Sequence, residues 1–261
     1  MNFLVVGAGI AGSSFARMAR EEGHTVTVMA SSVKKPASHA ALCVVKPSWF
    51  QGEFRNEADA SLIWYRRNGW LTNEQAIYRS HLRQGEESRG GYFTIDANGP
   101  LVLPDIWAEW DMSHTSGYDH VVVCRGAYSD STWARLYGVT TVATVETTAS
   151  TWAFNDRPRS VMFACSHDGH SLRFGSSKAK TSEKALANQR HDEEKAMNAG
   201  MIPVDAPRHY LHGVRLMPPS LDLAGQKLSL AKNVTAVEGF GRVGYSLAPA
   251  RMQSLLNELT K

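Results

Sequence analysis

The sequence lacks the features that mark a secreted, membrane-spanning or metal-binding protein. Its 261 residues include only three cysteines, Cys43, Cys124 and Cys165, which are odd in number and far apart. With no CxxC pair, neither a disulfide framework nor a cysteine metal site is expected, and a reducing, cytoplasmic setting is favoured. No apolar stretch approaches the length of a membrane span, and no basic segment precedes the apolar N-terminus. We therefore expect a cytoplasmic protein with no membrane partner and no metal.

No charge of one sign dominates the chain. The 28 Lys and Arg residues nearly balance the 25 Asp and Glu residues, which gives a net charge of +3. This balance permits an anionic ligand or a nucleic-acid partner but requires neither. The 43% hydrophobic content is ample for a packed core, in one large domain or two interleaved ones.

A glycine-rich turn near the N-terminus is the first sign of a ligand site. Phe3 to Val6 form a short apolar run typical of a buried parallel strand, Ser13 to Glu22 follow a helical pattern, and Thr25 to Met29 form a second strand. Between the first strand and the helix stands a G-x-G-x-x-G pattern, which allows a tight turn and a close approach of backbone to pyrophosphate. The context predicts a dinucleotide-binding unit, with the phosphates at the helix N-terminus, formed by Gly7, Ala8, Gly9, Ile10, Ala11 and Gly12.

The end of the second strand departs from the usual dinucleotide site. An acid commonly stands there and binds the adenosine ribose hydroxyls. Here the place is taken by Ala30, followed by Ser31 and Ser32, which we expect to lie against the ribose as weaker partners. Lys34 and Lys35 would suit a 2′-phosphate, so NADP stays open as the alternative cofactor.

The segment from Ala37 to Pro47 resembles a flavin-contacting segment of the D-amino-acid oxidase, glycine oxidase and sarcosine oxidase superfamily. In that family a stretch of small residues ending in proline runs past the flavin ring. Cys43 stands where the family usually has glycine, and Lys46 stands where an uncharged residue is commoner. The resemblance implies cofactor contacts from Ser38, His39, Ala40, Ala41 and Cys43.

Further segments resemble the same family in the expected order. Tyr118 to Ser129 is similar to its D-x-V-V-x-A-x-G-A-W-S strand and turn, and Asp168 to Ser177 to its G-x-L-x-I-G-x-T strand. Gly213 to Pro218 then precedes Glu238 to Ala250, which resembles the C-terminal flavin motif, a glycine-rich turn that leads into a helix at 247–259. The resemblance implies further cofactor contacts from Arg125, Gly126, Arg215, Gly239, Gly241, Arg242, Val243, Gly244, Tyr245, Ser246 and Leu247.

The resemblance implies a non-covalently bound FAD and the oxidation of a small amine or amino-acid-like substrate. In the family, a hydride passes from the amine-bearing carbon to the flavin, the imine hydrolyses, and molecular oxygen reoxidises the flavin. The cofactor carries the hard chemistry, and protein groups orient the substrate. Arg215 falls where relatives clamp the substrate carboxylate, while Arg242 and Lys46 are expected beside the flavin. These three residues are the catalytic candidates.

The implied fold is α/β, a Rossmann-like FAD-binding domain of the glutathione-reductase type interleaved with a smaller β-rich substrate domain. We expect 1–50, 112–140 and 210–261 in the FAD domain, and 51–111 and 141–209 in a substrate domain shorter than that of relatives. Its predicted strands and helices are 92–95, 141–145, 151–154, 160–165, 56–70 and 182–199. The polar residues 191–194 are expected on a solvated helix face.

Three alternatives remain open at this point. A short substrate domain leaves the flavin face open, which would suit the same chemistry on a glycine- or aminomethyl-modified base in DNA or RNA, flipped out or unpaired. The second alternative is a non-catalytic FAD-binding subunit of an oligomer, and the third is an NADP-binding reductase. The substrate, the electron acceptor and the oligomeric state do not follow from the sequence.

Overall fold

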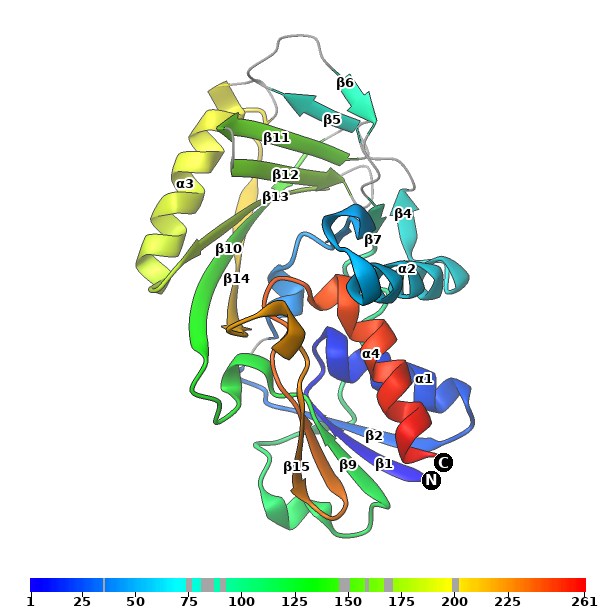
Figure 1. Cartoon of the computed structure of the whole chain (residues 1–261). Helices are drawn as coiled ribbons and strands as arrows, with labels where there is room; N and C mark the ends of the chain where they lie inside the picture. The colour runs from blue at the N-terminus through cyan, green and yellow to red at the C-terminus, as the bar shows by residue number, and fades with distance from the viewer. Residues whose placement is uncertain are drawn as a thin grey trace.

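The computed structural model describes residues 1–34, 36–73, 77–80, 87–89, 93–145, 151–157, 160–166, 171–198 and 202–261. Two large sheets make up most of the molecule, and the N- and C-termini lie next to each other at the end of the first (Figure 1). No helix within the described ranges is both long enough and apolar enough to cross a bilayer.

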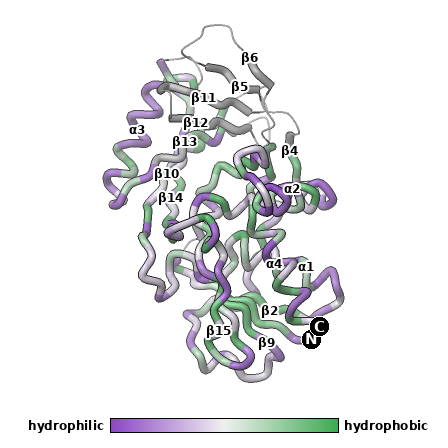
Figure 2. Tube along the Cα trace, in the orientation of Figure 1, coloured by the Kyte–Doolittle hydropathy of each residue, from purple (hydrophilic) through white to green (hydrophobic). Residues whose placement is uncertain are grey.

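The first sheet has six strands and is parallel apart from one edge strand. In spatial order these are β15 (Lys227–Ala231), β16 (Val234–Val237), β9 (His120–Val123), β1 (Asn2–Val6), β2 (Thr25–Ala30) and β8 (Ile106–Trp107), with β15 antiparallel. Figure 2 shows the central strands as a hydrophobic block, as expected for a parallel sheet covered on both faces. Phe3 and Val5 on one face of β1 and Leu4 on the other are fully buried.

Helices cover one face of this sheet. α1 (Ile10–Glu21) and α2 (Gly52–Arg67) both pack against α4 (Gly244–Leu259), so the first and last helices of the chain lie side by side (Figure 1). Their apolar faces are buried in the core, with Phe15, Met18 and Ala19 from α1 and Met252, Leu255 and Leu256 from α4. The joined helices place the glycine turn and the C-terminal motif beside each other.

The second sheet has seven strands and is mostly antiparallel. Its order is β14 (Arg208–Met217), β10 (Ala134–Thr144), β13 (Ser171–Ala179), β12 (Ser160–Ser166), β11 (Thr151–Arg157), β5 (Ile77–Ser80) and β6 (Glu87–Arg89). A small third sheet contains β3 (Val44–Val45), β7 (Phe93–Ile95) and β4 (Leu71–Asn73). The long strands β10 and β14 reach from the second sheet towards the first (Figure 1).

Helix α3 (Ser182–Asn198) packs on β10 and β13 through a buried polar cluster. Glu193 is 2% exposed and its carboxylate lies 2.6 Å from Nε of Arg208, while the Tyr210 hydroxyl donates to it at 3.0 Å. Gln189 donates to Thr141 Oγ1, also at 3.0 Å. The expectation that residues 191–194 form a solvated face is therefore wrong at Glu193, which turns inward to meet cationic and hydroxyl partners on β14.

The α/β fold class, with a parallel sheet and a separate antiparallel sheet, is confirmed. The predicted helices are all present, although α2 begins and ends a few residues before the expected 56–70. Lys35, Tyr92, residues 168–170 and Ala199 of the expected segments lie outside the described residues. The division into two domains stays a prediction; β8 and α2, from the range 51–111, pack with the parallel sheet and its helices.

Candidate FAD-binding site

A cavity of about 250 Å³ opens at the carboxyl ends of β1, β2 and β9. Its walls come from the glycine turn, the segment before β3, the turn after β9, strand β14 and the start of α4. Ligands of open parallel sheets bind in the crevice outside these strand ends, where the strand order reverses. Here β2 and β9 flank β1 on opposite sides, so the cavity lies at that reversal.

Each glycine of the N-terminal turn has a different physical reason. Gly7 has φ +109°, and a Cβ there would lie 2.3 Å from the Cys124 carbonyl oxygen; a Cβ on Gly12 would lie 1.9 Å from the Gly7 carbonyl oxygen. Both glycines are therefore required by packing. Gly9 is not, because its nearest neighbour, Cβ of Pro36, would be an ordinary 3.4 Å away. Gly9 lines the cavity, so the missing side chain leaves room for a ligand to approach the backbone.

The N-terminus of α1 lines the cavity with its first turn. Ser38 Oγ accepts a hydrogen bond from the backbone N–H of Ile10 at 2.9 Å, and the N-cap residue Gly9 provides no side-chain cap. The first N–H groups of a helix have no partner within the helix, and with the helix dipole they favour an anion. Open backbone at Gly9 and these donors fit a pyrophosphate.

The segment before β3 is fixed by bonds to the second sheet. Thr140 Oγ1 donates to the Ala40 carbonyl at 2.7 Å, and Arg173 Nη1 donates to the carbonyls of His39 and Ala41 at 3.1 Å each. The 3-10 helix η1 (Ala37–Ala40) and the following residues are thereby held along the cavity, which this segment lines with Ala37, Ser38, Ala41, Leu42 and Cys43.

Cys43 follows in a left-handed conformation with φ +55°, which favours glycine, the residue that the family resemblance implies at this position. Its side chain is buried, and burial raises the pKa of the thiol to about 11. The thiol is therefore protonated near neutral pH and is a poor nucleophile.

The C-terminal motif reaches the cavity through tight contacts with β14 and α2. A Cβ on Gly239 would lie 2.5 Å from the Leu216 Cβ, so glycine is needed for this approach. Tyr245 is buried, its carbonyl accepts from the Tyr65 hydroxyl at 2.9 Å, and the two rings stack 6.3 Å apart. These contacts fix the start of α4 next to the cavity.

Three cations gather where strands β14, β10 and β13 meet the C-terminal motif. The Arg215 guanidinium lies over Gly138, since a Cβ there would be 3.3 Å from its carbon and both terminal nitrogens. Burial, and then the charge of Arg242, lower the pKa of Arg215 to about 10. The pKa of Lys178 is also lowered, first by Arg242, then by burial and Arg215. An anionic ligand would relieve this repulsion.

Most of the predicted cofactor-binding residues meet at the cavity, and some do not. Gly12, Ser32, His39, Ala40, Val243, Ser246 and Leu247 do not line it. The cavity-lining residues of the prediction are Gly7, Ala8, Gly9, Ile10, Ala11, Ala30, Ser31, Ser38, Ala41, Cys43, Arg125, Gly126, Arg215, Gly239, Gly241, Arg242, Gly244 and Tyr245. Their roles towards a cofactor stay predictions.

Lys46 does not line the cavity either. Its ammonium lies 6.0 Å from the ring centroid of Trp49, which is 52% exposed and does line it. The catalytic role expected for Lys46 stays a prediction, and this geometry gives it no added support.

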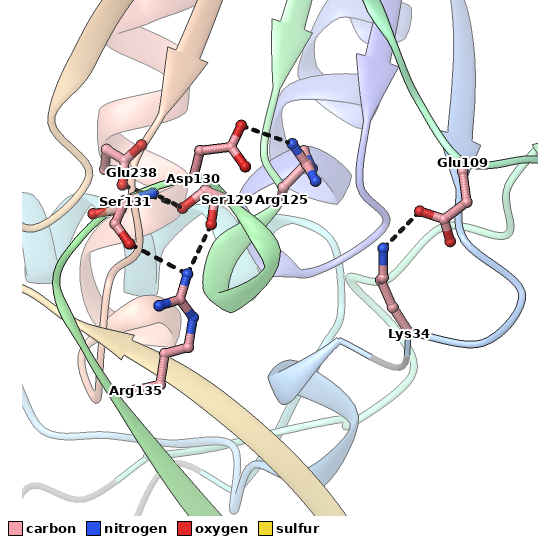
Figure 3. Close-up of polar contacts among 8 residues, drawn as sticks. All are labelled: Lys34, Glu109, Arg125, Ser129, Asp130, Ser131, Arg135 and Glu238. Atoms are coloured by element: carbon pink, nitrogen blue, oxygen red, sulfur yellow. Dashed lines mark hydrogen bonds and ion pairs between the residues drawn. The ribbon is translucent and has the colours of Figure 1, made fainter.

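Sequence reasoning missed two carboxylates in the cavity wall, Glu109 and Glu238. Glu109 accepts a hydrogen bond from Lys34 at 2.6 Å (Figure 3). It also accepts one from the Ser31 hydroxyl at 2.5 Å. Glu238 is 6% exposed, and Ser129 Oγ donates to it at 3.4 Å (Figure 3). Glu109 follows a two-residue strand that no periodicity reveals, whereas Glu238 directly precedes the glycines of the C-terminal motif.

The turn after β9 closes the wall between these carboxylates. Arg135 donates to the carbonyls of Ala127 and Ser129 at 2.8 Å each, and Arg125 lies 3.5 Å from Asp130 (Figure 3). Together, the crevice, the glycine turn, the helix donors and the cations fit a dinucleotide that carries a flat ring system.

Comparison with known proteins supports this assignment at the level of fold. No protein-family model matches the chain, and no curated protein matches it. Among solved structures, iminodiacetate oxidase from Chelativorans sp. is similar over 99% of this chain and 95% of its own, with a TM-score of 0.72 and 14% identity. Glycine oxidase from Geobacillus kaustophilus matches 99% of this chain and 94% of its own, with a TM-score of 0.66 and 14% identity.

An FAD-dependent oxidoreductase from Pseudomonas aeruginosa matches 99% of this chain and 90% of its own, with a TM-score of 0.67 and 15% identity. At these identities the likeness is one of architecture. The chain has the fold of the FAD-dependent oxidoreductases that include glycine oxidase, as its motifs predicted.

Proposed function

We propose that the chain binds FAD non-covalently and oxidises a C–N bond of a glycine-type amine, one that carries a carboxylate. The observation that supports this best is the position of Arg215. Its guanidinium is largely desolvated, lies beside Arg242, and lines the same cavity as the glycine turn. A carboxylate would neutralise it and accept two parallel charge-assisted hydrogen bonds. Two of the similar structures are named for glycine and iminodiacetate, which are amines of this kind.

In this proposal, different residues bind the cofactor and the substrate. The turn at Gly7 to Gly12 and the first turn of α1 hold the pyrophosphate, and the segment ending at Cys43 supports the ring from its backbone. Arg215 holds the substrate carboxylate, and Arg242 stabilises negative charge beside it. FAD, when bound, supplies the two-electron oxidation of the C–N bond to an imine, which water then hydrolyses. Molecular oxygen is the expected electron acceptor.

The first test is the visible spectrum of the purified protein, followed by anaerobic additions of glycine, sarcosine, iminodiacetate and D-alanine. We expect a yellow protein whose absorbance near about 450 nm is bleached by one of these amines. Arg215→Met should stay yellow, but the rate at which the amine bleaches it should fall at least about 100-fold. A buried charge-assisted pair contributes about 3 kcal/mol, which this variant would lose. Arg67→Met, at an exposed arginine paired with Glu21, is the matched control.

Two results would count against this reading. A colourless protein that cannot be reconstituted with FAD would contradict FAD as the cofactor and would favour NADP instead. Bleaching of Arg215→Met at the native rate would remove the carboxylate clamp. A yellow protein that no amine or modified nucleoside bleaches would instead favour the non-catalytic FAD-binding subunit.

A second candidate substrate is a glycine- or aminomethyl-modified base in DNA or RNA. It is favoured by Lys178 and Arg242, which add two cations beside the one needed for a carboxylate. Phosphates of a nucleic acid would give them partners, and the modified base would be flipped out to reach the cavity. Bleaching by a modified oligonucleotide but not by the free amines, weakening as salt is raised, would support this candidate. Equal bleaching by the free nucleoside at all salt concentrations would argue against it.

A further inference from the structure

The adenosine end of the cavity lacks the acid that dinucleotide sites usually place after the second strand. Strand β2 ends at Ala30, and this residue lines the cavity with Ser31. An alanine offers no acceptor to the ribose hydroxyls, which lose their bonds to water when the ribose is covered. A cofactor held here therefore needs an acceptor from elsewhere in the chain.

The neighbouring strand brings one to the same place. β8 pairs in parallel with β2, with Ala30 opposite Trp107, and the Ala108 N–H donates to the Ala30 carbonyl at 3.0 Å. The carboxyl ends of parallel strands meet at one edge of the sheet. Glu109 therefore emerges beside the end of β2, and it lines the cavity with Ala30 and Ser31.

The contacts of Glu109 fix its carboxylate and keep acceptor capacity free. One oxygen accepts from the Ser31 hydroxyl at 2.5 Å. The other accepts from the Lys34 ammonium at 2.6 Å (Figure 3). A carboxylate has about four lone-pair sites, so each oxygen retains room for one further donor. The bonds to Lys34 and then Ser31 also lower the pKa of Glu109, which keeps it ionised at neutral pH.

We infer that Glu109 is a cofactor-binding residue that accepts hydrogen bonds from the adenosine ribose hydroxyls of FAD, in place of the acid missing at Ala30. The inference rests on the proposed FAD binding. Ser31 and Lys34 position the carboxylate, so the serine acts through Glu109 rather than as the main ribose partner.

The same geometry argues against the role in binding a 2′-phosphate that the sequence suggests for Lys34. Paired with Glu109, its charge is already neutralised, and the carboxylate would repel a 2′-phosphate at the ribose. Glu109 thus selects against NADP-type nucleotides as well as binding the unphosphorylated ribose.

The experiment measures FAD binding to refolded or deflavinated apoprotein by quenching of flavin fluorescence, without turnover. The variants are Glu109→Gln and, as a matched control, Glu258→Gln. Both glutamates have 59% exposed side chains and pair with a lysine, Lys34 and Lys227 respectively, but Glu258 lies outside the cavity wall. We expect Glu109→Gln to raise the Kd for FAD about tenfold and Glu258→Gln to leave it unchanged.

Competition by nucleotides tests the ribose contact itself. ADP should displace FAD from the native protein better than 2′-phospho-ADP or 2′-deoxy-ADP, and Glu109→Gln should shrink both differences. Native FAD affinity in Glu109→Gln, or unchanged discrimination among the three nucleotides, would overturn the inference while leaving FAD binding intact. Failure of the native protein to bind FAD would instead overturn the proposed function.

Discussion

Cys43 shows the difference between identifying an unusual position from the sequence and explaining it from the structure. The motif shows that relatives commonly have glycine at this position, and the backbone at φ +55° gives the reason. Among the described residues it is the one non-glycine with a positive φ, a conformation that costs an L-residue about 1–2 kcal/mol. The site at Ala30 is the converse case. The sequence shows that an acid is missing there, but its replacement comes from Glu109, whose position depends on the pairing of β8 with β2.

At the residue scale, two glycines of the turn are expected to matter for different properties, Gly12 for the stability of the fold and Gly9 for the binding of FAD. Gly12→Ala should lower the free energy of unfolding by about 2–4 kcal/mol, because its Cβ meets backbone at 1.9 Å. Gly9→Ala should change stability by less than about 1 kcal/mol yet weaken FAD binding about tenfold or more, because its Cβ would make only ordinary contacts with the protein while Gly9 lines the cavity. Urea unfolding of the apoprotein and FAD titration measure the two quantities. Equal loss of stability in both variants would contradict the assignment.

At the scale of elements, the helices and the parallel strands can be predicted from the hydrophobic pattern of the sequence. Their polar contacts cannot be predicted in this way. The helices expected at 13–22 and 247–259 are found as α1 and α4, whose apolar faces meet apolar strands and one another. Helix α3 differs, since Glu193 is satisfied by Arg208 and Tyr210 from a strand that follows it in sequence. A helical pattern contains no information about such a distant partner, so a buried glutamate is taken for a solvated one.

The polar cluster under α3 is expected to stabilise the second sheet. Glu193→Ala should lower the free energy of unfolding by about 2–3 kcal/mol, because it removes the carboxylate that pairs with Arg208 and accepts from Tyr210, and Arg208 is only partly exposed. The neighbouring exposed Glu194→Ala should stay within about 0.5 kcal/mol of the native value. Chemical denaturation of the two variants provides the comparison, and similar losses in both would argue that α3 is not held by this cluster.

Strand β10 contacts the Arg215 guanidinium through Gly138. Gly138→Ala would place a methyl group 3.3 Å from the Arg215 guanidinium and displace it by a few tenths of an ångström. We expect KM for a carboxylate-bearing amine to rise about threefold to tenfold, with a smaller change in kcat, because the carboxylate clamp is misaligned rather than lost. Steady-state kinetics beside Arg215→Met would show whether the effect is a fraction of the full loss. An unchanged KM would mean that Arg215 does not hold the substrate from this position.

At the scale of the whole molecule, ligand binding should stabilise the fold as a unit, because the cavity joins both ends of the chain to the long strands. FAD at about 100 times its Kd should raise the free energy of unfolding by about 2.7 kcal/mol. For a chain of this size that corresponds to a rise in Tm of about 5–10 °C. Differential scanning fluorimetry with FAD, FMN and NADP tests this, and a larger shift with NADP than with FAD would contradict the proposed cofactor.

The overall architecture was accessible from sequence because its motifs fall in a fixed order, whereas the division of the chain between sheets was harder to predict. The short β8 leaves too little pattern to identify, yet it forms the edge of the parallel sheet. α2 reads as an ordinary amphipathic helix, and only its contact with α4 shows which layer it joins.

The interleaved walls of the cavity have a consequence for synthesis in the cell. Residues 6–49 supply the glycine turn and the segment before β3, residues 108–128 and 214–216 add further parts of the wall, and residues 237–245 complete it, with α4 packed on α1. A growing chain therefore carries an incomplete site while about 190 residues are made between its first and last wall segments. Cofactor capture is therefore expected only after residues 237–245 have been made and α4 has docked on α1.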